Sequence, residues 1–235
     1  MKKKILTLAL VVALVAMMVG GTLAYFTAED KVTNTFTIGS VKIEIHENDK
    51  PTESDTMPFG KLVPIVDTEN PAGDESYIQK AVKVENVGAN SAYVRTHIAI
   101  PTALVGYLYL DLNEAGWTRR EDSTATVDGV GYAVFTYDYN AVVAPKEFTT
   151  ELLKGVYLGS DVDLEEDANG SLWFVRKTDG EITHQSGFLA HTKTDNGYTT
   201  NTVNVLVASQ AIQADGFSDA ASALDCGFTA NPWAN

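Results

Sequence analysis

The chain has 235 residues and carries 31 acidic against 17 basic side chains, which gives a formal net charge of −14. This negative balance argues against nucleic acid and anionic membrane surfaces as partners. Because Cys226 is the single cysteine, an internal disulfide is excluded, and the fold has to be stabilised by its core and its sheet pairing.

The N-terminus has the layout of a secretory signal. Residues 2–4 are lysines, residues 5–19 form an apolar run interrupted only by Thr7, and two glycines precede a small-residue site. The pattern predicts cleavage between Ala24 and Tyr25. The apolar run is shorter than the roughly 20 residues of a spanning helix, although an uncleaved N-terminal anchor is the alternative. Cleavage removes three lysines and no acid, so 14 basic residues remain against 31 acids and the formal charge becomes −17.

The mature chain begins with a predicted strand. Phe36 and Ile38 alternate on one face, and the alternation continues after Gly39 as Val41 and Ile43 with its parity shifted by one residue. A shift of this kind at a glycine is typical of a β-bulge.

Further strands follow in the middle of the chain. Residues 92–100 alternate as a half-buried strand that ends at Pro101, and residues 108–112 and 132–139 read as two more strands. A short helix is predicted from Thr150 through residues 151–153.

The segment 159–171 is rich in carboxylates. Asp161, Asp163 and Asp167 are oxygen ligands of the kind that calcium prefers, although their spacing does not match an EF-hand loop. The segment therefore predicts either a weak calcium site or a solvated acidic loop. No other cofactor is expected.

Near the C-terminus, residues 203–208 are apolar on both faces, which predicts a central strand. Ser218 is positioned to cap a second short helix that runs to Gly227. Together these elements predict a mostly-β protein, namely a two-sheet antiparallel sandwich with one or two short helices, in a single domain spanning residues 25–235.

Catalytic motifs are not found. The histidines, His46, His97, His184 and His191, include no H-E-x-x-H arrangement, and no G-x-S-x-G elbow is present. His184 and His191 could meet across a hairpin and hold a metal, but a solvated pair is the favoured interpretation. His97 is expected to be hydrogen-bonded on the polar face of its strand, and Cys226 to be a small buried thiol. We therefore predict no catalytic residue.

Several stretches resemble the TasA and camelysin family of exported biofilm-matrix proteins of Gram-positive bacteria. The resemblance rests on Gly20 to Thr22, Ala24, Tyr25-Phe26, Thr35-Phe36, Gly39 and Val41, and more loosely on residues 82–101 and 205–224. It implies a jelly-roll sandwich, cleavage by a SipW-type signal peptidase, and assembly into extracellular fibres by strand donation. Because camelysin is described as a metalloprotease, the resemblance also implies a secreted hydrolase as an alternative.

The apolar segment after the predicted cleavage site supports assembly of the chain into fibres independently of the resemblance. Cleavage would leave a free end with an apolar strand-forming segment, which can pair with the sheet edge of another copy and propagate head to tail. The proposed donor residues are Tyr25, Phe26, Phe36, Ile38, Val41 and Ile43. The expected partners are further copies of the chain and other matrix proteins, at the cell surface or in the extracellular matrix. Two alternatives are a strand folded back into its own sheet, and a monomeric surface module that binds glycans through exposed tyrosines at positions 107, 109, 132, 137 and 139.

Overall fold

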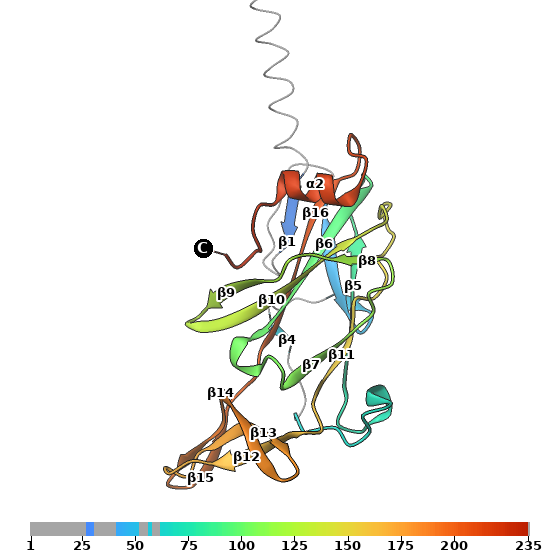
Figure 1. Ribbon diagram of the computed structural model, residues 1–235. Helices are drawn as coiled ribbons and strands as arrows, with labels where there is room; N and C mark the ends of the chain where they lie inside the picture. The colour runs from blue at the N-terminus through green and yellow to red at the C-terminus, as the bar shows by residue number, and fades with distance from the viewer. Residues whose placement is uncertain (1–26, 31–40, 52–55, 58–61, 235) are drawn as a thin grey trace, which may run out of the picture.

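The computed structural model describes residues 27–30, 41–51, 56–57 and 62–234, and within them it is mostly β (Figure 1). All the strand pairs are antiparallel and form three sheets. Sheet A has the order β1 (Thr27–Asp30), β16 (Val205–Gln213), β6 (Ala92–Pro101), β10 (Val130–Tyr139), β8 (Trp117–Arg119), with β4 (Thr56–Met57) beside β16 and β9 (Ser123–Val127) beside β10. Sheet B has the order β3 (Lys50–Pro51), β2 (Ile43–Glu47), β5 (Ile78–Asn86), β11 (Leu153–Leu158), β7 (Leu108–Leu112).

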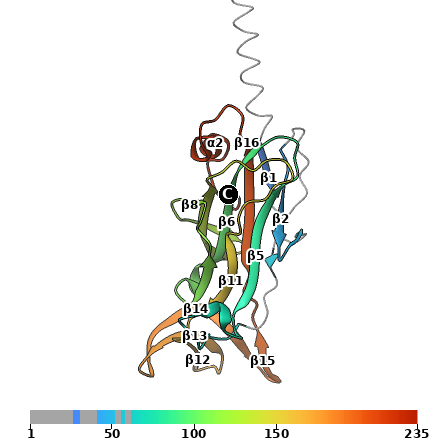
Figure 2. The same ribbon diagram turned by 90° about the vertical axis from the view of Figure 1, so that its right-hand side faces the viewer.

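The expected sandwich is present, and a third sheet accompanies it. Sheet C consists of β12 (Val162–Glu166), β13 (Leu172–Thr178), β14 (Glu181–Thr194) and β15 (Gly197–Thr200), and it lies at the opposite end of the molecule from helix α2 (Ala220–Gly227) in both views (Figures 1 and 2). Two short 3₁₀ turns, η1 (Pro71–Gly73) and η2 (Thr102–Leu104), complete the described elements.

One large apolar core joins the three sheets. Ile98 and Tyr137 of sheet A pack with Val82 and Leu153 of sheet B, and Phe174 of sheet C belongs to the same cluster. Because these side chains come from all three sheets, the sandwich and sheet C share one hydrophobic interior.

Strand β6 differs from its expected half-buried state, because all ten of its residues are buried. Its inner face belongs to the core between the sheets. Its outer face is covered by α2, whose Leu224 packs with Tyr93, and by the C-terminal segment, whose Trp233 packs near Ala99. The central strand expected for residues 203–208 is confirmed for residues 205–208 by β16, which is buried along its whole length between β6 and the strands β1 and β4.

The two helix predictions have opposite outcomes. The C-terminal helix is confirmed as α2, although its cap is Asp219 rather than Ser218: the Asp219 carboxylate accepts the backbone N–H of Ser222 at 2.8 Å. The helix predicted at residues 150–153 is wrong, because Leu153 begins β11 and pairs with Val82 on one side and Leu112 on the other. Pairing on both sides outweighs the weak local preference of a Thr-Glu-Leu-Leu run.

We expect that replacing Asp219 with alanine will lower the melting temperature by about 2–4 °C, because the first turn of α2 loses its capping acceptor. Differential scanning calorimetry measures the shift. Ser218→Ala is the matched control, since the Ser218 hydroxyl bonds the Asp219 carboxylate and does not itself cap the helix. An equal shift for both variants would contradict the assignment of Asp219 as the cap.

Among the described residues, no helix is both long enough and apolar enough to cross a membrane.

Candidate functional site

The outer edge of β16 is covered by short segments from the N-terminal part of the chain. On this edge, β1 pairs with residues 209–212 of β16, and β4 pairs with Val205 and Leu206. The register places Thr27 opposite Ile212 and Asp30 opposite Ser209. Figure 1 shows β1 lying beside β16 below helix α2. The edge of β16 is therefore a backbone surface that accepts a short strand.

The segment predicted as a single donor is divided between two sheets. Ala24, Tyr25, Phe26, Phe36 and Ile38 lie outside the described residues. Val41 and Ile43 are 3% and 2% exposed and pack with Val84 and Ala211 in the chain's own sandwich, where Ile43 of β2 pairs with Asn86 of β5. In this arrangement β2 is part of the protein's own sheet B, whereas β1 lies at the edge of sheet A.

The three aspartates of the predicted calcium segment each have a different partner. The Asp161 carboxylate lies 2.6 Å from Arg176, and the Asp163 carboxylate accepts from Lys177 at 2.8 Å. This contact with Lys177 holds the pKa of Asp163 below its usual range.

Asp167 is used inside its own turn. Its carboxylate accepts the indole N–H of Trp173 and the backbone N–H groups of Asn169 and Ser171, which lowers its pKa. Part of the expected loop is strand β12, in which Val162 and Leu164 alternate with the acids. The structure does not bring the three carboxylates together.

His184 is exposed, as the favoured interpretation expects, whereas the expectation that Cys226 is buried is wrong. His184 and His191 lie on the same strand, β14, opposite Arg176 and Leu172 of β13, so they do not meet across a hairpin. His191 instead contacts the Thr200 hydroxyl at 3.0 Å. Cys226 is exposed rather than buried, because it occupies the solvent side of the last turn of α2.

The tyrosines expected as a glycan platform do not form one face. Tyr107, Tyr132 and Tyr137 are 7%, 4% and 0% exposed, so their rings belong to the interior. Tyr109 is at the surface and stacks on Tyr157 at 5.5 Å, while Tyr139 packs on Trp117 at 4.9 Å.

His97 is buried in a polar network on the outer face of sheet A. It is 2% exposed, with Nδ1 2.9 Å from the Thr136 hydroxyl and Nε2 3.0 Å from Oε1 of Gln210. Because the amide oxygen of Gln210 can only accept, Nε2 carries the proton and Nδ1 accepts from Thr136. Burial lowers the pKa of His97 to about 4, so the ring is neutral. The expected polar-face histidine is therefore hydrogen-bonded, but it is not at the surface.

An ion network lies beside His97. Arg95 donates to both carboxylate oxygens of Asp138, at 2.6 and 2.9 Å, and to Asp225 of α2 at 2.6 Å. Arg120 donates to the other oxygen of Asp225 at 2.6 Å. An open pocket of about 420 Å³ is lined by Arg95, Arg120 and Asp225 and by residues 228–231. Because Arg95 lies on β6 and Asp225 on α2, the network joins helix α2 to sheet A.

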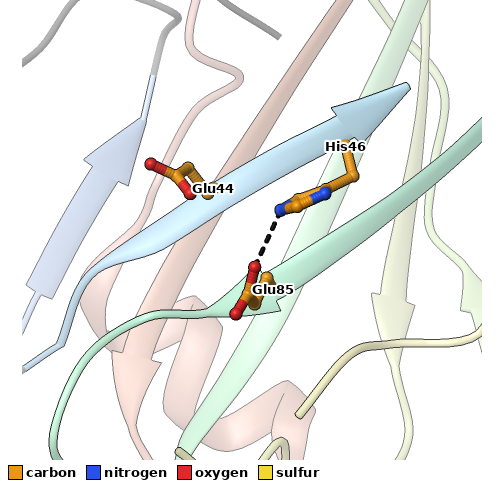
Figure 3. A group of neighbouring side chains, drawn as sticks. All are labelled: Glu44, His46 and Glu85. Carbon is orange, nitrogen blue, oxygen red and sulfur yellow. Dashed lines mark ion pairs between the residues drawn. The ribbon is translucent and has the colours of Figure 1, made fainter. Parts of the chain in front are cut away.

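A second polar cluster lies on the outer face of sheet B (Figure 3). Glu44 and His46 are two residues apart on β2 and point away from the core that Ile43 and Ile45 face. Glu85 of β5 lies directly opposite Glu44. His46 Nε2 is 2.8 Å from Glu85 Oε2, and the His46 ring packs edge-on against Phe148 at 5.1 Å.

This cluster was not recognised in the sequence. The spacing of Glu44 and His46 on a strand was visible, but Glu85 joins them only through the register of β2 on β5, which the sequence does not specify.

Comparison with known proteins finds no matching family model, no matching curated protein and no matching solved structure.

Proposed function

We propose that this protein is an exported structural subunit that assembles head to tail by passing its N-terminal strand to the next copy. The observation that carries the proposal is the pairing of β1 with the edge of β16. With the predicted cleavage after Ala24, β1 begins two residues from the new N-terminus. A strand at a free end can leave its edge without any other part of the chain having to be threaded out.

The connection between β1 and β2 supports the exchange. Residues 31–42 separate β1 in sheet A from β2 in sheet B, and these twelve residues can span at most about 40 Å. That reach allows β1 to pair either with its own β16 or with the β16 of a neighbouring copy. In both cases the same backbone hydrogen bonds form, so the exchange has a low cost.

The geometry of the exchange makes it open-ended. The donor surface is β1 and the acceptor surface is the β16 edge, so each copy offers one of each. A contact between two different surfaces continues from copy to copy unless the rotation between them closes a ring. Repetition of this contact would produce a fibre suited to an extracellular matrix.

We expect the mature protein that begins at Tyr25 to form filaments visible by electron microscopy, and a version that begins at Gly39 and lacks β1 to remain dispersed. Because the mature copies carry a formal charge of −17 and repel one another, assembly is expected to increase with salt, which screens charges over about 8 Å at 0.15 M. Circular dichroism of the shorter version checks that the sandwich still folds.

A cysteine pair distinguishes donation from folding back. Ala28 and Ala211 are opposite each other in the β1–β16 register, so Ala28→Cys with Ala211→Cys, in a Cys226→Ser background, reports which chain supplies the strand. Disulfide-linked ladders on a non-reducing gel indicate donation, whereas an internal crosslink with no filaments at any salt concentration would refute it. Ala28→Cys with Ala208→Cys is the mismatched control, since Ala208 is three residues away on β16 and on its other face.

A further inference from the structure

We propose that Glu44, His46 and Glu85 bind a divalent transition-metal ion of the Zn²⁺ class on the outer face of sheet B. This inference is independent of the assembly proposed above. The three side chains come from adjacent strands, and their donor atoms, one from each residue, all lie within 4.8 Å of one another (Figure 3). Within the part of the chain that the structure describes, no other group of three such side chains comes this close together.

The distances fit a single ion. Zinc binds imidazole nitrogen and carboxylate oxygen at about 2.0–2.2 Å, so two ligands of one ion are about 3–4 Å apart. His46 Nε2 and Glu85 Oε2 are already 2.8 Å apart, and the widest separation in the cluster is no more than 4.8 Å. Small rotations of the two glutamate side chains therefore suffice, and the strands that carry them need not move.

The buried ring nitrogen of His46 provides a second observation in favour of a metal ion. His46 is 7% exposed, and its Nε2 is a buried nitrogen that has no hydrogen-bond partner. The Glu85 oxygen is close enough for a charge interaction, but the two groups do not have the geometry of a hydrogen bond. A buried polar atom left in this state is destabilising, and coordination to a cation through its lone pair would satisfy it.

The pairing of β2 with β5 places two carboxylates next to each other, where a bound cation would offset their repulsion. Glu44 and Glu85 face each other directly across the β2–β5 pair, where like charges repel. Lys83, which is opposite His46, has its ammonium 2.6 Å from Asp49 and over the ring of Phe148. Its charge is thus directed to Asp49, and Phe148 fixes the orientation of the imidazole by packing against its edge.

The donor set selects the kind of ion. Calcium prefers six to eight oxygen ligands, whereas imidazole together with carboxylate suits zinc and related first-row ions. Three protein ligands also leave at least one coordination position for water. The site is therefore of the open type rather than the closed four-ligand type of structural zinc sites.

We expect the mature protein in a Cys226→Ser background to bind one equivalent of Zn²⁺ by isothermal titration calorimetry and to melt at a higher temperature when Zn²⁺ is present. Glu44→Gln, His46→Gln and Glu85→Gln should each weaken the binding by at least about tenfold, since a lost ligand should cost no less than a lost supporting residue. Co²⁺ used in place of Zn²⁺ should give a visible absorption band that His46→Gln abolishes.

Matched controls are available on sheet C. Glu181→Gln and His184→Gln change exposed residues of β14 and should leave the affinity for Zn²⁺ unchanged. The proposal is overturned if the protein does not bind Zn²⁺ stoichiometrically, or if the three cluster variants bind it as tightly as the parent. Glu44→Gln keeps the test valid if His46→Gln disturbs folding, because Glu44 is only partly buried.

Discussion

Replacing Asp138 with alanine is expected to destabilise the protein by about 3–5 kcal/mol, because it removes the main partner of a buried arginine. The side chains of Arg95 and Asp138 are only 8% and 3% exposed, and two hydrogen bonds join them. Without Asp138, Arg95 keeps a single contact with Asp225, whose side chain is half exposed. Urea denaturation followed by circular dichroism measures the loss.

Two further variants test this explanation. Arg119→Ala breaks a pair with Asp122 in which both side chains are 48% exposed, and it should cost no more than about 1 kcal/mol. The double replacement Arg95→Met with Asp138→Leu removes both buried charges and should recover much of the stability. If Asp138→Ala cost no more than Arg119→Ala, the buried ion pair would not be holding sheet A as described.

The second large effect is a loss of stability in acid that depends on His97. The pKa of its imidazole is about 6.5 in the unfolded chain and is lowered to about 4 in the folded protein, because burial disfavours the charged ring. As the pH falls, the unfolded state therefore binds a proton before the folded state does. The contribution of His97 to the free energy of unfolding is therefore fully present above pH 6.5. It is lost as the pH falls to about 4, and the loss amounts to about 3 kcal/mol.

Comparison with a variant isolates this effect from other titrations. Arg95, Asp138 and Asp225 lie nearby, and Glu121 lines the same pocket, so the parent protein alone cannot assign the slope to one group. His97→Gln replaces the imidazole with a neutral amide that can still donate and accept. Urea midpoints measured from pH 7 to pH 4 should fall less steeply for His97→Gln than for the parent.

The exposed histidine provides the control. His184→Gln removes a histidine on β14 that is open to solvent, so its curve should follow that of the parent. Parallel curves for the parent and His97→Gln would mean that the buried ring does not control the acid response.

The strands that could be predicted are those whose local pattern matches their final environment. Residues 108–112 and 132–139 alternate along their strands, and residues 205–208 are apolar on both faces, and all three segments form strands near their expected positions. The predicted burial of β6 was wrong because Arg95 and His97 are typical of a solvent-facing side. Their cover comes from α2 and residues 228–234, more than 120 positions later in the chain.

The third sheet and the metal-ligand cluster were missed for a related reason. In β12 the run of acids hid the alternation of Val162 and Leu164, so a strand was interpreted as a loop. The Glu44, His46 and Glu85 cluster depends on which residue of β5 lies opposite Glu44, and a shift of one position would turn Glu85 to the other face. The alternation of apolar and polar residues along one segment carries no information about the register of β2 on β5.

The position of β16 has a consequence for the order in which the protein folds. This strand is the last in the chain, yet it joins β1, β4 and β6 into sheet A, with Thr27 of the first described strand opposite Ile212. A chain that emerges N-terminus first, from a ribosome or from a secretion channel, cannot complete this sheet until nearly all of its residues are available. The topology thus delays completion of sheet A until the chain is almost fully released, and β1 and the free edge of β6 are exposed to other copies during that interval.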